Sequence, residues 1–342
     1  MKSIAMFNNK GGVGKTTLGC NLASFLSIRF EKKVLVVDCD PQCNATQLMM
    51  GEDYITSLYW EDSKNNITTI KSILQPIEDG DSEINKDIKP IPNSQNRFSV
   101  DIIPGHPELA IIEDKLGSAW QDSLAGDVGG IRKTNWNTDL CKTLSSKYDF
   151  IIFDLGPSLG SVNRSVLTGC DFFLTPMGTD IFSILGVKNI AEWLKNWTDL
   201  YSNSLRVCQS RAPKRLESYV INKELPIKKG YIGYTIQQYI TKSKEGIRRP
   251  TKAYEDILIK VPEVIEKSIG DYRNPTLKFS NLNLGDVPHL YSLVPLAQSV
   301  SSPIINLNTN DGLIGSQFKQ REEYSDIIGK IASNMLKNIG VS

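Results

Sequence analysis

The sequence has few of the residues and patterns that several protein classes require. Its six cysteines include no C-x-x-C pair and it has only two histidines, so a zinc site is not expected. No apolar run approaches the roughly 20 residues needed to span a bilayer. A first strand that is expected to begin by about residue 3 leaves no room for a signal peptide. We therefore expect a cytoplasmic protein in a reduced compartment, with no membrane partner.

Net charge is also nearly absent, at a formal +1 over 342 residues, so composition alone does not indicate a nucleic-acid partner. The charge is unevenly distributed, however. Between Arg206 and Lys260, thirteen Lys and Arg accompany five Asp and Glu, so this stretch carries +8 and the remainder −7. The asymmetry suggests a polyanion-facing surface, with an ordinary solvated basic loop as the alternative. The densest part follows an expected strand and contains the DNA-binding candidates Lys242, Lys244, Arg248, Arg249 and Lys252.

One stretch carries a strong chemical signal: residues 8–17, with the sequence NNKGGVGKTT. It follows a short apolar run and opens a helix in which leucines recur every four residues. Glycines allow backbone N–H groups to converge on a phosphate, and the helix N-terminus adds partial positive charge. Lys15 would reach the β- and γ-phosphates, and Thr16 would place its hydroxyl on Mg²⁺. The expected phosphate cradle is Gly11, Gly12, Val13, Gly14, Lys15, Thr16 and Thr17.

Two expected strands end in carboxylates. The apolar run 33–38 ends at Asp38, with Asp40 two residues later, and four apolar residues within 148–160 precede Asp154. In open α/β sheets, ligands lie outside the carboxyl ends of the strands, so these acids are expected to face the nucleotide. Asp40 could orient a water or bind Mg²⁺ through its shell, and Asp154 could hold Mg²⁺. A capping role in a loop is the alternative, more for Asp38 than for Asp40.

These segments resemble the ParA/MinD family of ATPases, whose deviant Walker A motif reads K-G-G-x-G-K-[ST]-[ST]. Asn9 stands where the general motif has its first glycine, and Lys10 is the early lysine of the deviant motif. The resemblance implies a homodimer with two ATP molecules sandwiched between its subunits, in which Lys10 reaches the partner's nucleotide. It also implies ATP and Mg²⁺ as ligands and slow hydrolysis that a ParB-like or other partner protein stimulates.

The same resemblance implies a role for each site residue. Lys10, Lys15 and Asp40 would be catalytic, with Asp40 positioning the attacking water. Mg²⁺ would lie on Thr16, Asp40 and Asp154. The adenine would lie near Gln237 and the segment from Pro295 to Gln298, and DNA would be bound without sequence preference through its phosphates.

The sequence departs from the family pattern at three places. Cys43 replaces a glycine, Gly156 replaces a proline, and Gln237 replaces an asparagine near the adenine. These departures keep open a ParA-like ATPase that regulates a protein-partner system, in cargo positioning or defence, without binding DNA. A metal-cluster relative is a minor alternative, because the cysteines do not occupy matching positions.

The expected fold is α/β: a mostly parallel twisted sheet with helices on both faces, of the deviant Walker A class of P-loop NTPases. We expect residues 1–342 to form a single P-loop ATPase domain with insertions near 51–97 and 198–230. The first insertion reads as solvated, with one helix around Thr68–Leu74. Leu290–Pro295 reads as the last strand, and a closing helix of mixed charge is expected over 317–338.

Overall fold

The structure is a computed structural model that describes residues 1–60, 67–239, 241–244, 247–250 and 252–341. Within these residues, a seven-stranded parallel sheet has the order β3-β2-β4-β1-β5-β6-β9. Its strands are β1 (Lys2–Met6), β2 (Val34–Asp38), β3 (Asp101–Ile103), β4 (Phe150–Asp154), β5 (Phe172–Gly178), β6 (Tyr231–Tyr239) and β9 (Asn283–Pro288). An antiparallel ribbon of β7 (Thr241–Lys244) and β8 (Ile247–Pro250) follows β6.

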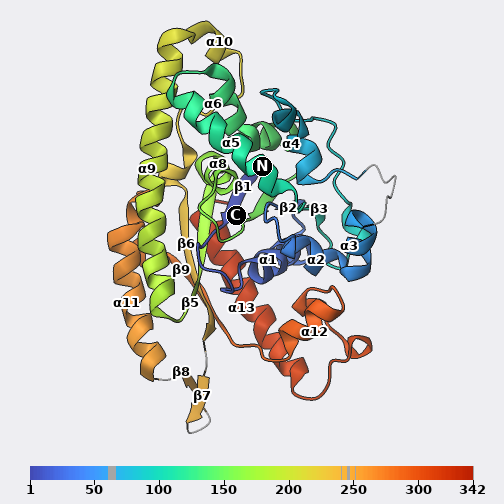
Figure 1. The fold of residues 1–342 in the computed structure, drawn as a ribbon. Coiled ribbons are helices and arrows are strands. Elements are labelled where there is room, and N and C mark those ends of the chain that lie inside the picture. The colour runs from blue at the N-terminus through green and yellow to red at the C-terminus, as the bar shows by residue number, and fades with distance from the viewer. Residues whose placement is uncertain (61–66, 240, 245–246, 251, 342) are drawn as a thin grey trace.

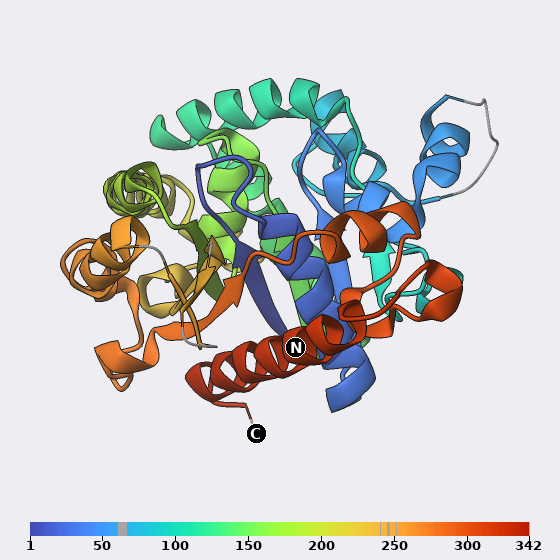
Figure 2. The ribbon, with the colours of Figure 1, turned by 90° about the horizontal axis from the view of Figure 1, so that it is seen from below.

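Helices cover both faces of the sheet (Figures 1 and 2). One face carries α4 (Ile70–Asp79), α5 (Leu109–Leu124), α6 (Val128–Thr134), α7 (Trp136–Leu144), α8 (Ser161–Gly169), α9 (Ile181–Arg211) and α11 (Lys252–Ser268). The other face carries α1 (Lys15–Phe30), α2 (Asn44–Met50), α12 (Leu293–Ser299) and α13 (Gln317–Asn338). The short helices α3 (Glu52–Tyr59) and α10 (Pro213–Glu217) lie at the periphery. The expected α/β fold is therefore confirmed.

The central strand β1 shows why the sheet needs cover on both sides. Ala5 and Phe7 point into the core that contains α5 and α9, whereas Ile4 and Met6 point into the core that contains α1 and α13. Successive side chains of a strand alternate between faces, so a continuous apolar run buries both. This two-sided burial fixes β1 in the middle of the sheet, and the loop that follows β1 opens at the sheet's carboxyl edge.

The helix expected around Thr68–Leu74 is present as α4, but the expectation that residues 51–97 are solvated is wrong for this helix. Thr69 caps this helix through reciprocal hydrogen bonds with Ser72, a capping box. Its apolar positions recur at a spacing of three and four residues, which places them on one face, and all four are buried in the core: Ile70, Ile73, Leu74 and Ile77. Residues 61–66 of this region lie outside the described residues.

Two other boundaries also differ from expectation. The insertion expected near 198–230 starts within a helix of the core. Helix α9 continues to Arg211 and buries Tyr201 and Cys208 along its inner face. The segment Leu290–Pro295 is not a strand, because Leu293 begins α12. Among the residues that the structure describes, the last strand is the more polar β9, which pairs with β6 and forms an edge of the sheet.

Helix α13 occupies Gln317–Asn338 and packs against α1 and β9. None of the helices in the described part of the chain is long and apolar enough to cross a membrane. The assignment of residues 1–342 to one domain stays a prediction.

Candidate nucleotide-binding site

Three neighbouring strands bring the predicted motifs to one edge of the sheet. The parallel register pairs Met6 of β1 with Asp154 of β4, and Asp38 of β2 with the same Asp154. The glycine-rich loop follows β1 directly, and Asp40 lies two residues beyond the end of β2. Segments about 140 residues apart in sequence therefore meet because the strands are parallel and in register.

The glycine-rich loop has the backbone that a phosphate cradle requires. Gly12 and Gly14 have φ angles of 73° and 77°, in the left-handed region that glycine adopts without strain. Gly14 is the N-cap of α1 and has no side chain, so the cap itself leaves the N–H groups of the first turn without a side-chain acceptor. A Cβ on Gly11 or Gly12 would meet no atom within 4 Å. Open space in front of free N–H groups is suited to an anion.

Lys15 is the buried cation of this loop. Its Nζ donates to the Lys10 carbonyl oxygen at 3.0 Å. Burial lowers its pKa, and the negative charges of Asp154 and Asp40 oppose that shift. An ammonium held behind a glycine loop, with few other partners, can bind the oxygens of a polyphosphate.

The buried acid at the end of β4 has one free oxygen. Thr16 Oγ1 donates to Asp154 Oδ2 at 2.8 Å, whereas Asp154 Oδ1 is buried without a protein partner. Burial raises the pKa of this carboxyl above its usual range; the nearby Asp38 adds to the shift, and the Thr16 hydroxyl and Lys15 oppose it. Thr16 and Asp154 thus offer hydroxyl and carboxylate oxygens, the donors that Mg²⁺ prefers, so they fit a Mg²⁺ ion with its water shell.

The two acids after β2 have different surroundings. Asp38 is fully buried, and its Oδ2 accepts hydrogen bonds from the Thr46 N–H and hydroxyl at 2.8 and 2.7 Å. Asp40 lines the cleft, and its Oδ1 accepts from the Gln42 N–H at 3.0 Å. Asp38 therefore stabilises the conformation of the loop after β2, and Asp40 is the acid that can face a ligand.

Two of the departures from the family pattern surround Asp40. Cys43 has a φ angle of 52°, so this turn keeps a left-handed backbone of the kind that glycine favours. Gly156 lies against Asp40, because a Cβ there would be 3.1 Å from Asp40 Oδ1. The glycine leaves the Asp40 carboxylate close to the loop that follows β4.

A cleft of 1210 Å³ opens in front of these groups. Its outer wall is built from the α2–α3 junction and from α12 with the loop after it, including Gly51, Gln298 and Ser301. Of the predicted adenine contacts, Gln298 is among its lining residues, whereas Gln237 and Pro295 are not. Gln237 is buried in β6 and donates to Thr235 Oγ1 at 2.7 Å, and Pro295 lies within α12 between lining residues.

Most of the outer wall and one anchoring acid could not be predicted from the sequence. Apart from Asn44 and Gln298, the cleft residues of α2, α3 and α12 belong to no predicted motif, and only the fold brings them opposite the glycine loop. Asp180 binds Lys10 Nζ at 2.5 Å and caps α9 by accepting from the Phe182 and Ser183 N–H groups. In this structure Lys10 is therefore directed toward its own chain.

The DNA-binding candidates occupy the ribbon and the helix after it. The register places Lys242 opposite Arg249 and Ser243 opposite Arg248, and Lys252 begins α11. The ribbon projects beyond the carboxyl end of β6, away from the body of the molecule (Figure 1). The side chains of these candidates lie outside the described part of the structure.

Comparison with known proteins identifies the family. A family model described as an AAA domain, AAA_31, matches residues 1–207, which is more than half of the chain. The chain belongs to the ParA/MinD family of P-loop ATPases.

The chain is 30% identical over 188 residues to the chromosome partitioning protein ParA of Myxococcus xanthus, covering 55% of this chain and 56% of that protein. It is 29% identical over 189 residues to the sporulation initiation inhibitor protein Soj of Bacillus subtilis, covering 55% and 63%. The matches thus span less than two thirds of these relatives' lengths.

Solved structures show the same fold over the whole chain. Protein DIP2308 from Corynebacterium diphtheriae superposes with a TM-score of 0.74 at 31% identity, covering 99% of both chains. The ATP complex of Cyanothece McdA superposes with a TM-score of 0.60 at 15% identity, covering 100% of this chain and 97% of that one. At 15% identity, the second likeness concerns the fold alone.

The raised pKa of Asp154 predicts the effect of removing its charge. In metal-free protein at neutral pH, Asp154→Asn should increase the free energy of unfolding by about 1 kcal/mol or more, because the fold disfavours the ionised carboxylate. A carboxyl whose pKa is raised by folding destabilises the fold as pH rises above its unfolded pKa of about 3.9, so the gain should shrink toward acid pH.

Urea unfolding with a metal chelator, measured at several pH values, tests this prediction. Asp114→Asn on the exposed side of α5 is the matched control and should change stability little at any pH. A loss of stability in Asp154→Asn at neutral pH would contradict the electrostatic description of the site.

Proposed function

We propose that this ParA-family ATPase is a dimerising switch that binds ATP with Mg²⁺, binds DNA without sequence preference, and hydrolyses ATP to partition or position DNA or another cargo. A ParB-like or other partner protein would stimulate the hydrolysis. The proposal is supported above all by the grouping of chemically suited residues at one edge of the sheet: Lys10, Lys15, Thr16, Asp40 and Asp154.

In this proposal the chain's own residues act by positioning and by charge. Lys15 and the N–H groups of the glycine loop hold the phosphates, and Asp40 orients the attacking water against the terminal phosphate. Thr16 and Asp154 would hold Mg²⁺, and Asp40 would contact its water shell. When bound, the ion neutralises charge on the phosphate oxygens. The barrier is lowered mainly because charges and water are held in place before reaction.

Lys10 would link nucleotide binding to dimerisation. In the single chain it pairs with Asp180, and both side chains are 35% exposed. A partly exposed ion pair of this kind contributes little to the free energy of unfolding, so Lys10 can exchange Asp180 for a more strongly charged partner. A triphosphate on a second subunit is such a partner, and Lys10 would contact it across the interface.

DNA binding is assigned in this proposal to the β7–β8 ribbon and the start of α11. Four of the five basic candidates lie on the two paired strands, so their charges are concentrated in one small element. Lysine and arginine in this arrangement would contact phosphates, and the affinity would fall steeply with salt.

Electrophoretic mobility shift tests the DNA part of the function. With ATP and Mg²⁺, duplexes of unrelated sequence should be retarded equally, and with ADP or no nucleotide they should not be. The double variant Lys242→Gln, Arg249→Gln should weaken DNA binding. The control is Lys267→Gln, which removes one exposed positive charge from α11. ATP hydrolysis without any ATP-dependent DNA binding would favour the alternative in which the switch acts on a protein partner.

Asp40→Ala tests the catalytic assignment. The variant should bind ATP and dimerise but hydrolyse it about 10²-fold more slowly, because the water loses its orienting carboxylate. Asp40→Asn, which can still accept from Gln42, should be similarly slow. Phosphate release measured at saturating ATP gives the rate. Turnover at the wild-type rate in either variant would show that Asp40 does not position the water.

A further inference from the structure

The outer wall of the cleft has a strained backbone. Ser301 has a φ angle of 45°, a left-handed conformation that non-glycine residues rarely adopt. Its Oγ lies close to Gly51 of the facing wall, 2.9 Å from where a Cβ on that glycine would be. Strain of this kind persists only where surrounding contacts fix the chain, and it is concentrated at functional sites. The wall segment around Ser301 must therefore be held by contacts with other parts of the chain.

The first anchor ties the wall to the P-loop helix. The Ser302 N–H donates to the Ala297 carbonyl oxygen at 3.0 Å, which closes the end of α12. Two residues later the Ile304 N–H donates to Asn21 Oδ1 at 2.8 Å, and Asn21 Nδ2 donates to the Thr17 carbonyl oxygen at 2.8 Å. Asn21 is buried in α1, so the wall is connected directly to the first turn of the helix that follows the P-loop.

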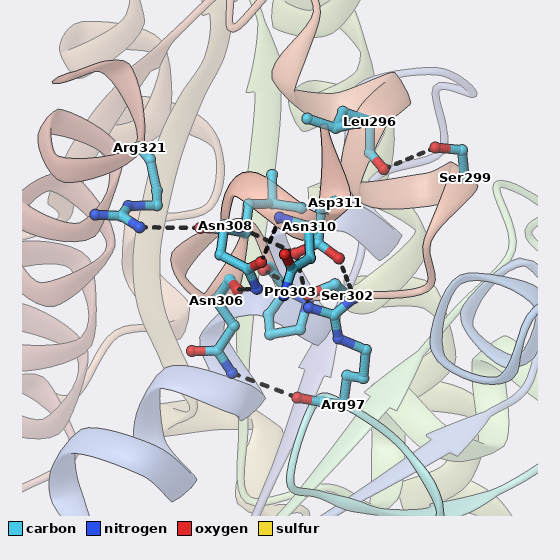
Figure 3. A network of polar contacts seen from close by, with 11 residues as sticks. Arg97, Leu296, Ser299, Ser302, Pro303, Asn306, Asn308, Asn310, Asp311 and Arg321 are labelled. Carbon is cyan, nitrogen blue, oxygen red and sulfur yellow. Dashed lines mark hydrogen bonds and ion pairs between the residues drawn. The ribbon is translucent and has the colours of Figure 1, made fainter. Parts of the chain in front are cut away.

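The second anchor lies farther along the same segment (Figure 3). Arg97, in the loop before β3, binds Asp311 through two parallel contacts, Nη1–Oδ1 at 2.6 Å and Nη2–Oδ2 at 2.8 Å. Asp311 Oδ2 also accepts from the Asn308 N–H at 3.0 Å, and Arg321 Nη1 donates to the Leu307 carbonyl oxygen at 2.9 Å. The hydrogen bond from Arg97 holds the pKa of Asp311 below its usual value. A bidentate arginine–carboxylate pair fixes both distance and orientation.

We propose that Arg97 and Asp311 are positioning residues for the nucleoside end of ATP. This inference rests on the proposed function, because it assumes that the triphosphate lies on the glycine loop. With the phosphates there, the base and sugar must lie toward the rest of the cleft, whose outer wall includes Val294, Gln298 and Ser301. The Arg97–Asp311 pair holds the far end of the segment that carries this wall.

The two anchors should affect different parts of the ligand. Asn21 belongs to the P-loop helix and has no contact with the Arg97–Asp311 pair among its hydrogen bonds, so the phosphate cradle should remain intact when Arg97 is changed. The side chain of Arg97 is 39% exposed and that of Asp311 is 9% exposed. Asp311 also accepts from the Asn308 N–H, so its carboxylate keeps a partner when Arg97 is changed. Loss of the pair should therefore loosen the wall without unfolding the protein.

The test compares ATP with inorganic tripolyphosphate, which has the phosphates but no nucleoside. With Mg²⁺ present, Arg97→Gln and Asp311→Asn should each weaken ATP binding about tenfold in titration calorimetry while tripolyphosphate binding stays unchanged. Hydrolysis at saturating ATP should stay within about twofold of wild type, so the KM rises and kcat does not fall. Glu263→Gln, in the exposed ion pair with Lys267 on α11, is the matched control and should change neither affinity.

Equal weakening of ATP and tripolyphosphate would overturn the proposal, because the pair would then support the whole site. Unchanged ATP binding would overturn it as well. If both variants fail to fold, Arg97→Lys keeps the charge but loses the bidentate geometry, so selective weakening of ATP in that variant is still expected. Failure of the wild-type protein to bind ATP would contradict the proposed function itself.

Discussion

Crowding of negative charge at the carboxyl ends of two adjacent strands is the constraint on which the site depends. The parallel register places Asp38 and Asp154 side by side in the sheet, and Asp40 follows two residues later. Thr46 satisfies Asp38, and Thr16 satisfies one oxygen of Asp154, but the other oxygen has no protein partner. Burying such groups disfavours their ionised forms. Lys15 opposes this charge with a single positive one, so the site suits a ligand that includes a divalent cation.

The fold supplies that ligand site by packing two helices against the glycine loop. Helix α1 begins at Lys15, and Gly186 of α9 lies so close to the loop that a Cβ there would be 2.6 Å from Asn9 Oδ1. The α9 cap, Asp180, binds Lys10. The same loop thus lines the cleft on one side and contacts α9 on the other. In the proposed function this geometry lets one short segment respond to both nucleotide and partner subunit.

The local motifs could be predicted from the sequence, whereas the surroundings that complete the site could not. The glycine loop, the strands ending at Asp38 and Asp154, and the α/β fold all follow from short patterns with a physical requirement at each position. The apolar spacing of α4 was also present in the sequence, as Ile70, Ile73, Leu74 and Ile77, but the polar residues around it favoured a solvated segment.

Contacts between distant segments explain the remaining misses. The edge strand β9 is partly exposed and polar, whereas the more apolar segment after it, which predicts a strand, contains the start of α12. Asp180 and Asp311 acquire their partners, Lys10 and Arg97, only through packing over 170 and 214 residues of sequence. The roles of Lys10, Asp40 and Asp154 in the reaction stay predictions.

The molecular mass of the protein in solution, measured by sedimentation with ATP, a non-hydrolysable analogue, ADP or no nucleotide, tests the switch most directly. The wild type should be a dimer with ATP or the analogue and a monomer otherwise. Lys10→Ala should bind the analogue with unchanged affinity but remain monomeric, because only the contact across the interface is lost. A full-strength dimer from Lys10→Ala, or a wild-type monomer saturated with the analogue, would contradict this account.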